Sequence, residues 1–225
     1  MVMNNSDDSF IREVNDELRS EQMQNVWRRF RPIIIGGAAL IVVGVAGASL
    51  WEWWQARESS ASGDRFIAAV KSAADAKHDD ATKALEALSK DGFGAYPMLA
   101  RLRLATLKAE KGDAKGAIAD FTAIGKEASV PQAVRSAAKL RAAWLMVDNN
   151  SYEELASAVE ELAAPSSPVR NSAREALGLS AYKAGNYAKA KEWLQLIIDD
   201  NDAPASAKTR ARTVIALITA SGKLS

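Results

Sequence analysis

The stretch Leu177–Ile197, LGLSAYKAGNYAKAKEWLQLI, predicts two helices joined by a tight turn. Gly185 and Asn186 mark the turn, because these residue types tolerate the positive φ that a sharp chain reversal requires. Gly178 and Ala190 are small, which suits positions where two helices cross closely. The tyrosines on either side of the turn are large and would fill the remaining space. The stretch therefore predicts a helical hairpin.

Similar turns recur along the chain at intervals of 33, 38 and 35 residues. The turns HDDATKA, KGDAKGA, NNSYEEL and AGNYAKA place a small or apolar residue at equivalent positions, Ala84, Ala117, Leu155 and Ala190. The segments between the turns carry apolar stripes at helical spacing, and none shows the sustained alternation of a strand. The sequence therefore predicts an all-α fold.

The repeating unit resembles the tetratricopeptide repeat, whose period is about 34 residues. The hairpin in Leu177–Ile197 carries the clearest match, and the other units match less closely. The second unit matches through Ala105, Gly112, Asp113, Ala117 and Phe121. The resemblance implies a solenoid of about four helical hairpins within residues 55–225, closed by a capping helix over Pro204–Ser221. Repeat arrays need such a terminal helix with one polar face.

In tetratricopeptide arrays the first helix of each pair lines a concave groove that binds protein segments. The resemblance carries this role to Leu102, Thr106, Leu140, Trp144, Leu179, Tyr182 and Lys183. Trp144 and Tyr182 stand out because aromatic anchors dominate binding hot spots, with core packing as the alternative for both. Few basic residues line this groove, which favours apolar or extended partner segments over a C-terminal carboxylate.

Ahead of the repeats, residues Ile33–Trp51 (IIIGGAALIVVGVAGASLW) form a run of 19 uncharged residues. As a helix this run would be roughly 28 Å long, close to the ~30 Å hydrocarbon core of a bilayer. A buried core helix and a signal peptide cleaved after Ala48 are the alternatives. The acid-rich stretch of 32 residues before the run differs from the short basic start of a signal peptide. We expect an uncleaved transmembrane anchor over residues 32–54.

Basic residues flank this run unequally. Four arginines lie between residues 13 and 31, and two lie between residues 52 and 70. The positive-inside rule therefore predicts a cytoplasmic N-terminus, with residues 55–225 on the other side of the membrane. Tryptophans at both borders of the run fit the aromatic belts of the two lipid interfaces.

The predicted cytosolic segment, residues 1–31, has its own apolar stripe. Phe10, Val14 and Leu18 recur every four residues after the acidic start Asp7-Asp8. This spacing favours an amphipathic helix that lies on membrane lipid or against a partner, with a frayed tail as the alternative.

The composition offers little for catalysis. The chain has 225 residues, a net charge of +1, no cysteine and a single histidine, His78. These counts argue against metal, cofactor and thiol chemistry, and the balanced charge argues against nucleic acid. Adjacent side chains on a helix point about 100° apart, so acidic pairs such as Asp199-Asp200 are poor acid-base dyads. We predict that these pairs lie on solvated faces. We therefore predict no enzyme activity, no catalytic residue, no cofactor and no small-molecule substrate.

The whole arrangement resembles the YfgM-like family, the ancillary subunits of the Sec translocon in Gram-negative bacteria. The resemblance lies in the segment FIREVNDELRSEQMQNVWRRFRP, the single span and the tetratricopeptide-like domain after it. It implies an inner-membrane protein with a periplasmic domain that contacts translocon subunits, periplasmic chaperones and nascent secreted chains. The alternative is a structural coordinator of cell division or wall synthesis built from the same repeat type.

Overall fold

The computed structural model describes the backbone of residues 6–222 and the side chains of residues 27–33 and 35–222. Helix α1, Ser6–Ala74, contains the uncharged run and the segment before it. The chain divides after Glu58 into two compact units. The last part of α1, residues 59–74, belongs to the second unit together with all later helices.

The uncharged run in the first unit is exposed at every position whose side chain the structure describes, residues 33 and 35–51. From Trp27 onward α1 is long and apolar enough to cross a membrane, and none of its apolar window is buried. Leu40, Val42 and Val43 are each about two thirds exposed or more, at 76%, 66% and 69%. A core helix of a soluble domain would bury these side chains, so this part of α1 is a candidate membrane span.

The C-terminal border of this candidate span carries clustered aromatic side chains. The rings of Trp51 and Trp54 lie 5.3 Å apart, and the Arg57 guanidinium lies 5.5 Å from the Trp53 ring. At the other end, the predicted stripe of Phe10, Val14 and Leu18 falls within α1, but its side chains lie outside the described residues.

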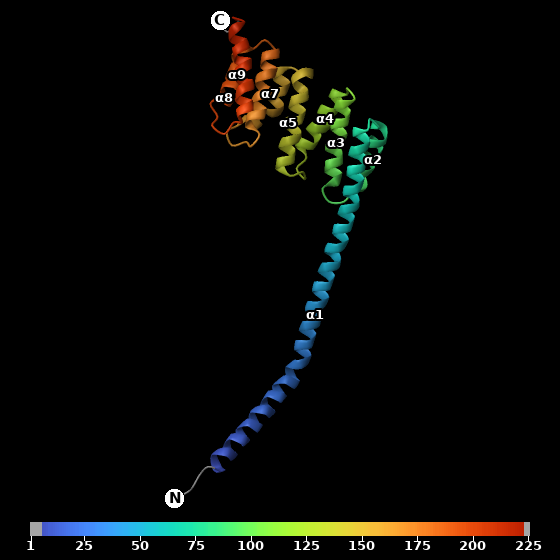
Figure 1. Cartoon of the computed structure of the whole chain (residues 1–225), viewed down its shortest axis with the longest axis vertical. Helices are drawn as coiled ribbons and strands as arrows, with labels where there is room; N and C mark the ends of the chain where they lie inside the picture. The colour runs from blue at the N-terminus through green and yellow to red at the C-terminus, as the bar shows by residue number, and fades with distance from the viewer. Residues whose placement is uncertain (1–5, 223–225) are drawn as a thin grey trace. The chain divides into compact units, whose positions relative to one another are not determined.

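The described residues of the second unit form helices joined by short loops, with no strand among them. Its helices stack side by side in chain order (Figure 1). After the end of α1, the elements are α2 His78–Asp91, α3 Tyr96–Glu110, α4 Ala114–Lys126, α5 Gln132–Asn149, α6 Tyr152–Val159, the short 3-10 helix η1 Glu160–Ala163, α7 Arg170–Lys183, α8 Tyr187–Ile198 and α9 Ala205–Ala220.

These helices form four pairs followed by one further helix in the described residues. Residues 59–74 pair with α2 through a cluster that includes Ala69 and Leu85, and α3 pairs with α4. The third pair is α5 with α6 and η1, and the fourth is α7 with α8. Helix α9 packs on α8. The prediction of an all-α solenoid of about four pairs plus a capping helix is confirmed.

Local capping explains where three of the second helices begin. Asp113 accepts a hydrogen bond from the Gly116 amide at 2.9 Å, and Asn186 accepts one from the Lys189 amide at 3.1 Å. Ser151 and Glu154 form a reciprocal capping box at the start of α6. Each cap satisfies amides that a helix start leaves without partners, which fixes the turn and the following register.

The close-crossing position lies four residues after each of these caps. Ala117, Leu155 and Ala190 are all fully buried there. In the first pair the equivalent residue is Ala81, also fully buried, whereas Ala84 is exposed. The predicted placement of Ala84 is therefore wrong. Helix α2 begins earlier than the turn sequence indicated, after Lys77, which makes no side-chain cap.

The fourth pair shows why small residues are needed where helices cross. A Cβ on Gly178 would lie 2.8 Å from Cγ of Leu194, a buried residue of the facing helix α8. The large tyrosines sit at the other end of the pair, where the rings of Tyr182 and Tyr187 meet edge to face at 5.6 Å. Both packing predictions for this hairpin are confirmed.

Candidate functional site

The first helices of successive pairs share one surface, and its centre is an exposed stripe on α5. Arg141, Trp144 and Asp148 are exposed and lie three and four residues apart, on one side of the helix. Trp144 leaves 38% of its surface accessible, which is unusual for the largest side chain in proteins. This stripe is the most prominent aromatic surface of the helical pairs.

Polar contacts tie the α5 stripe to the first helices on either side. The Arg141 guanidinium donates a hydrogen bond to Oγ1 of Thr106 on α3 at 3.1 Å. From α7, the Lys183 ammonium donates to the backbone carbonyls of Val147 and Asp148 at 3.2 and 2.8 Å. A cation at these carbonyls satisfies the acceptors that the end of a helix leaves open. We call the surface formed by Thr106, Arg141, Trp144, Asp148, Leu179 and Lys183 the first-helix face.

Trp144 and Leu179 lie at the same level of this face. Trp144 lies four residues, about one helical turn, before Asp148, and Leu179 lies four residues before Lys183. Lys183 and Asp148 contact each other across the two helices. The first helices run parallel because each is followed by an antiparallel partner. The tryptophan on α5 and the leucine on α7 therefore lie at corresponding levels of the two helices.

Leu179 opens onto an apolar hollow of about 250 Å³ between α7, α8 and α9. Leu194 and Val214 form its walls, and an ion pair closes one side. In that pair Arg210 Nε and Nη2 donate to the two carboxylate oxygens of the buried Glu175, at 2.5 and 2.8 Å. The hydrogen bond to Glu175 raises the pKa of Arg210 above its ordinary value, so the guanidinium stays charged. The hollow has room for one apolar side chain.

The structure distributes the seven predicted groove residues over α3, α5 and α7. Thr106, Trp144, Leu179 and Lys183 come together on the first-helix face. Three others pack beneath it: Leu102 against the cluster around Phe121, Leu140 against the cluster around Leu177, and Tyr182 against Tyr187 and Ile218. Binding by any of the seven stays a prediction.

Sequence reasoning missed two polar members of the face, Arg141 and Asp148. Their spacing of three and four residues from Trp144 was a usable signal, because these positions share one side of a helix. The first-helix face is consequently more polar than the sequence indicated, with one cation on either side of the tryptophan.

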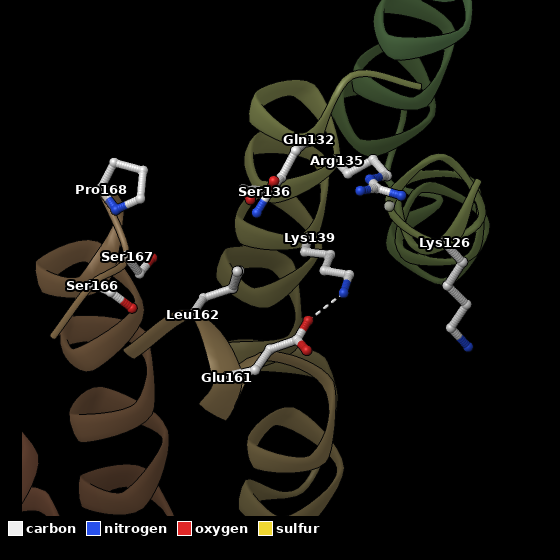
Figure 2. Close-up of a pocket in the computed structure, with 11 residues that line it drawn as sticks. Lys126, Gln132, Arg135, Ser136, Lys139, Glu161, Leu162, Ser166, Ser167 and Pro168 are labelled. Atoms are coloured by element: carbon white, nitrogen blue, oxygen red, sulfur yellow. Dashed lines mark hydrogen bonds and ion pairs between the residues drawn. The ribbon is translucent and has the colours of Figure 1, made fainter. Parts of the chain in front are cut away.

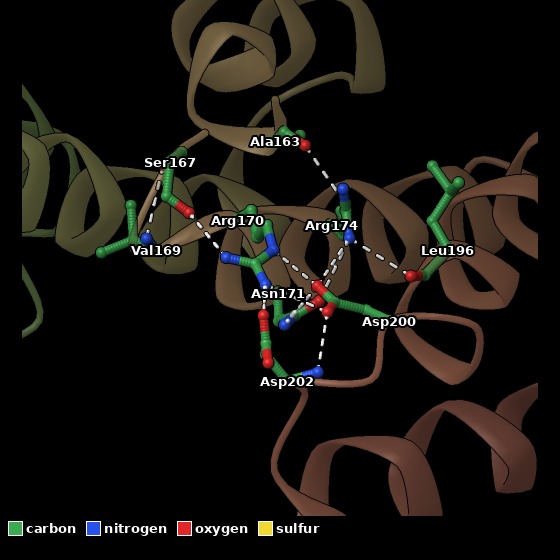
Figure 3. A network of polar contacts seen from close by, with 9 residues as sticks. All are labelled: Ala163, Ser167, Val169, Arg170, Asn171, Arg174, Leu196, Asp200 and Asp202. Atoms are coloured by element: carbon green, nitrogen blue, oxygen red, sulfur yellow. Dashed lines mark hydrogen bonds and ion pairs between the residues drawn. The ribbon is translucent and has the colours of Figure 1, made fainter. Parts of the chain in front are cut away.

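A dense polar network lies at the start of α7 and holds Asp200 at its centre (Figure 3). Arg170 donates to both Asp200 oxygens at 2.5 and 3.0 Å, and Asn171 and Arg174 donate at 3.0 and 3.2 Å. Arg174 is itself buried and also donates to the carbonyl of Ala163. The network therefore fastens the start of α7 to the end of η1 and to the loop after α8.

Asp200 was predicted to lie on a solvated face, and that prediction is wrong, since only 10% of its side chain is accessible. The hydrogen bonds from Arg170 lower the pKa of this carboxyl well below its ordinary value of 3.8. The partners saturate the carboxylate, so it has no lone pair available for acid-base chemistry. Among the described residues no three His, Asp or Glu side chains come together as metal ligands.

The lowered pKa of Asp200 predicts acid sensitivity. Because the pKa of Asp200 is lower in the folded protein than in the unfolded chain, the ionised carboxylate stabilises the fold. This stabilisation is fully present above the ordinary pKa of 3.8 and is lost as the pH falls below it. We expect the melting temperature of the detergent-solubilised chain to fall as the pH drops from about 4 to about 2, and Asp200→Asn to melt lower at pH 7 and to lose much of this dependence. Asp202→Asn, at an exposed carboxyl of the same network, is the control. An unchanged acid slope in Asp200→Asn would contradict the assignment.

Comparison with known proteins gives one family match. The family model described as "Tetratricopeptide repeat-like domain" matches residues 24–168, more than half of the chain. The match ends in the loop before α7, so the hairpin that resembles the repeat most clearly lies outside it. No curated protein and no solved structure matches the chain.

Proposed function

Because the chain belongs to the tetratricopeptide repeat-like domain family, we propose that it is a membrane-anchored interaction scaffold whose first-helix face binds an extended segment of a partner protein. Such repeat domains are typically interaction modules without catalytic activity. The observation that carries the proposal is the exposed Trp144 between two cations, at the same level as the apolar hollow beside Leu179. An aromatic platform next to a small apolar pocket suits a chain with alternating apolar side chains.

The polar groups of the face would fix the direction of that chain. Arg141 and Lys183 each donate hydrogen bonds to oxygen atoms of the protein, but both side chains remain exposed. A backbone carbonyl of a bound partner segment could therefore also accept hydrogen bonds from these two side chains. Backbone contacts of this kind are independent of sequence, whereas the hollow beside Leu179 selects for size. The face would thus accept many extended chains that present an apolar residue.

We further propose that the partners belong to protein export. The YfgM-like resemblance and the arginine-rich flank of the candidate span support an inner-membrane protein with a cytoplasmic N-terminus and a periplasmic repeat domain. In that place the partners would be Sec translocon subunits, periplasmic chaperones and nascent secreted chains. Membrane lipid would surround residues 32–54 and could hold the amphipathic segment of residues 1–31.

A photo-crosslinking amino acid at position 144 tests this proposal in cells. We expect it to capture translocon subunits, chaperones or secreted chains, and we expect the same group at Ala188, exposed on α8, to capture none of them. Capture of division or wall-synthesis proteins, together with intact secretion after depletion, would instead support an envelope coordinator. Recovery of none of the export proteins at position 144 would overturn the export role.

Trp144→Ala gives the second test of the face. Truncation of a hot-spot tryptophan typically costs about 2 kcal/mol or more, so we expect co-purified partner to fall by roughly tenfold or more. Because the ring is partly exposed, the melting temperature should change little. Val134→Ala on α5, which removes a partly buried packing residue of the same helix, should leave partner recovery unchanged.

A further inference from the structure

A second concave surface lies on the other side of α5, between that helix, the end of α4 and η1 (Figure 2). This recess has a volume of about 560 Å³. Arg135 and Lys139 line it from α5. Lys139 lies two residues before Arg141 of the first-helix face, so the two side chains point about 200° apart around the helix. The recess and the first-helix face are therefore separate surfaces.

The recess exists because the third pair has a short second helix. Helix α6 spans 8 residues and continues as the 4-residue η1, whereas α4 spans 13. Gly125 near the end of α4 lets the stem of Lys139 approach closely, since a Cβ there would lie 2.6 Å from Cγ of Lys139. The lysine is thereby held along the wall of the recess.

Three cationic residues and one acidic residue line this recess. Lys139 forms an ion pair with Glu161, which Figure 2 shows at the centre of the site. The side chains of Lys126 and Arg135 also line it, and neither side chain has an ion pair or hydrogen bond within the part of the chain that the structure describes. The side chains of Ser136 and Ser166 add hydroxyl groups to the wall. The recess thus presents unmatched positive charge beside neutral hydrogen-bonding groups.

A second hollow of about 370 Å³ adjoins the recess and is lined in part by α6. Lys126, Lys139 and Glu161 line both, so the two hollows lie end to end, and we call them together the cationic groove. Glu154 at its far part already accepts hydrogen bonds from Ser151 and Asn150, which lower the pKa of its carboxyl. Glu154 therefore stays negatively charged, and the excess of positive charge lies in the recess that Arg135, Lys126 and Lys139 line, where Glu154 is absent.

We propose that the cationic groove is a second docking site, which binds an extended acidic segment of a partner protein. Carboxylates of that segment pair with Lys126 and Arg135, and the serine hydroxyls hydrogen-bond its backbone. The charge complementarity selects acidic side chains, and the elongated outline suits a chain rather than a compact anion. The scaffold would then hold two partner segments at once, on opposite sides of α5.

A glutamate-rich peptide tests this proposal with the full chain in neutral detergent. We expect a fluorescent Glu-Ser peptide to bind by anisotropy, with an affinity that falls at least about tenfold in Lys126→Glu/Arg135→Glu. The matched control is Lys191→Glu/Arg212→Glu, which makes the same charge change at exposed positions on α8 and α9 and should alter the affinity less than about twofold. Trp144→Ala should leave this binding intact, so failure of the first-helix face and failure of the cationic groove give different results.

Three outcomes would overturn the docking site. One is equal loss in both charge-reversed variants, which would show attraction to net charge alone. Another is equal binding of a Gln-Ser peptide, which would remove the role of the carboxylates. The third is displacement of the peptide by inorganic phosphate or by anionic lipid vesicles that supply the same concentration of negative charge as the peptide. That result would assign the groove to another kind of anion. Circular dichroism of Lys126→Gln/Arg135→Gln, which should lose binding but keep its melting temperature, separates these results from misfolding.

Discussion

Replacing Val42 and Val43 with lysine should move the protein from the membrane fraction to the soluble or aggregated fraction. Both residues lie at the middle of the Ile33–Trp51 run and are exposed, so the lysines would meet lipid rather than protein. A lysine at the centre of a span raises the apparent free energy of insertion by about 2.5–3.5 kcal/mol, and two of them would exceed what the remaining apolar residues return. Carbonate extraction of membranes followed by immunoblotting measures the effect.

Two controls define this result. Val42→Leu/Val43→Leu should stay in the membrane, and Ala61→Lys, an exposed position beyond the candidate span, should do so as well. Continued membrane insertion of the double-lysine variant would contradict a span at residues 33–51. A mature chain that begins at Ser49, detected by mass spectrometry, would show cleavage after Ala48 and would contradict the anchor while leaving the repeat domain unaffected.

Local signals in the sequence were enough to predict most of the helical register. Asp113, Ser151 and Asn186 cap their helices with their own side chains, so the residue four positions later is specified within one turn of sequence. The first pair lacks such a cap. There the start of α2 depends on packing against α1, and the predicted crossing residue fell three positions from the observed one, Ala81.

The polar sites depend on contacts that no local pattern contains. Asp200 meets Arg170 from 30 residues away, Thr106 meets Arg141 from 35, and Lys139 meets Glu161 from 22. The sequence could predict that α3, α5 and α7 share a face, because the repeat period fixes that. It could not predict which charged side chains would be buried or left without a partner, because this depends on how the pairs stack and on how short α6 is.

The crossing of α7 and α8 gives the largest expected change in stability. Leu194→Ala removes a buried side chain and should lower the free energy of unfolding by about 2–5 kcal/mol. Gly178→Ala should lower it by about 1–3 kcal/mol, because the new methyl group would overlap Leu194. Urea unfolding of the detergent-solubilised chain measures both, and Ala188→Val, at an exposed position on α8, is the control for adding side-chain volume to a helix.

The double variant shows whether these two residues define the crossing. With Leu194 shortened, the methyl group at position 178 enters vacated space, so the Gly178→Ala change should cost less or become favourable. The combined loss should then be smaller than the sum of the single losses by about 0.5–3 kcal/mol. Additive losses would show that the side chains at positions 178 and 194 do not contact each other. The stability change in Gly178→Ala would then arise within α7 alone. A favourable coupling would instead identify the contact that sets how closely α7 and α8 pack, and with it the position of Leu179 at the hollow beside α9.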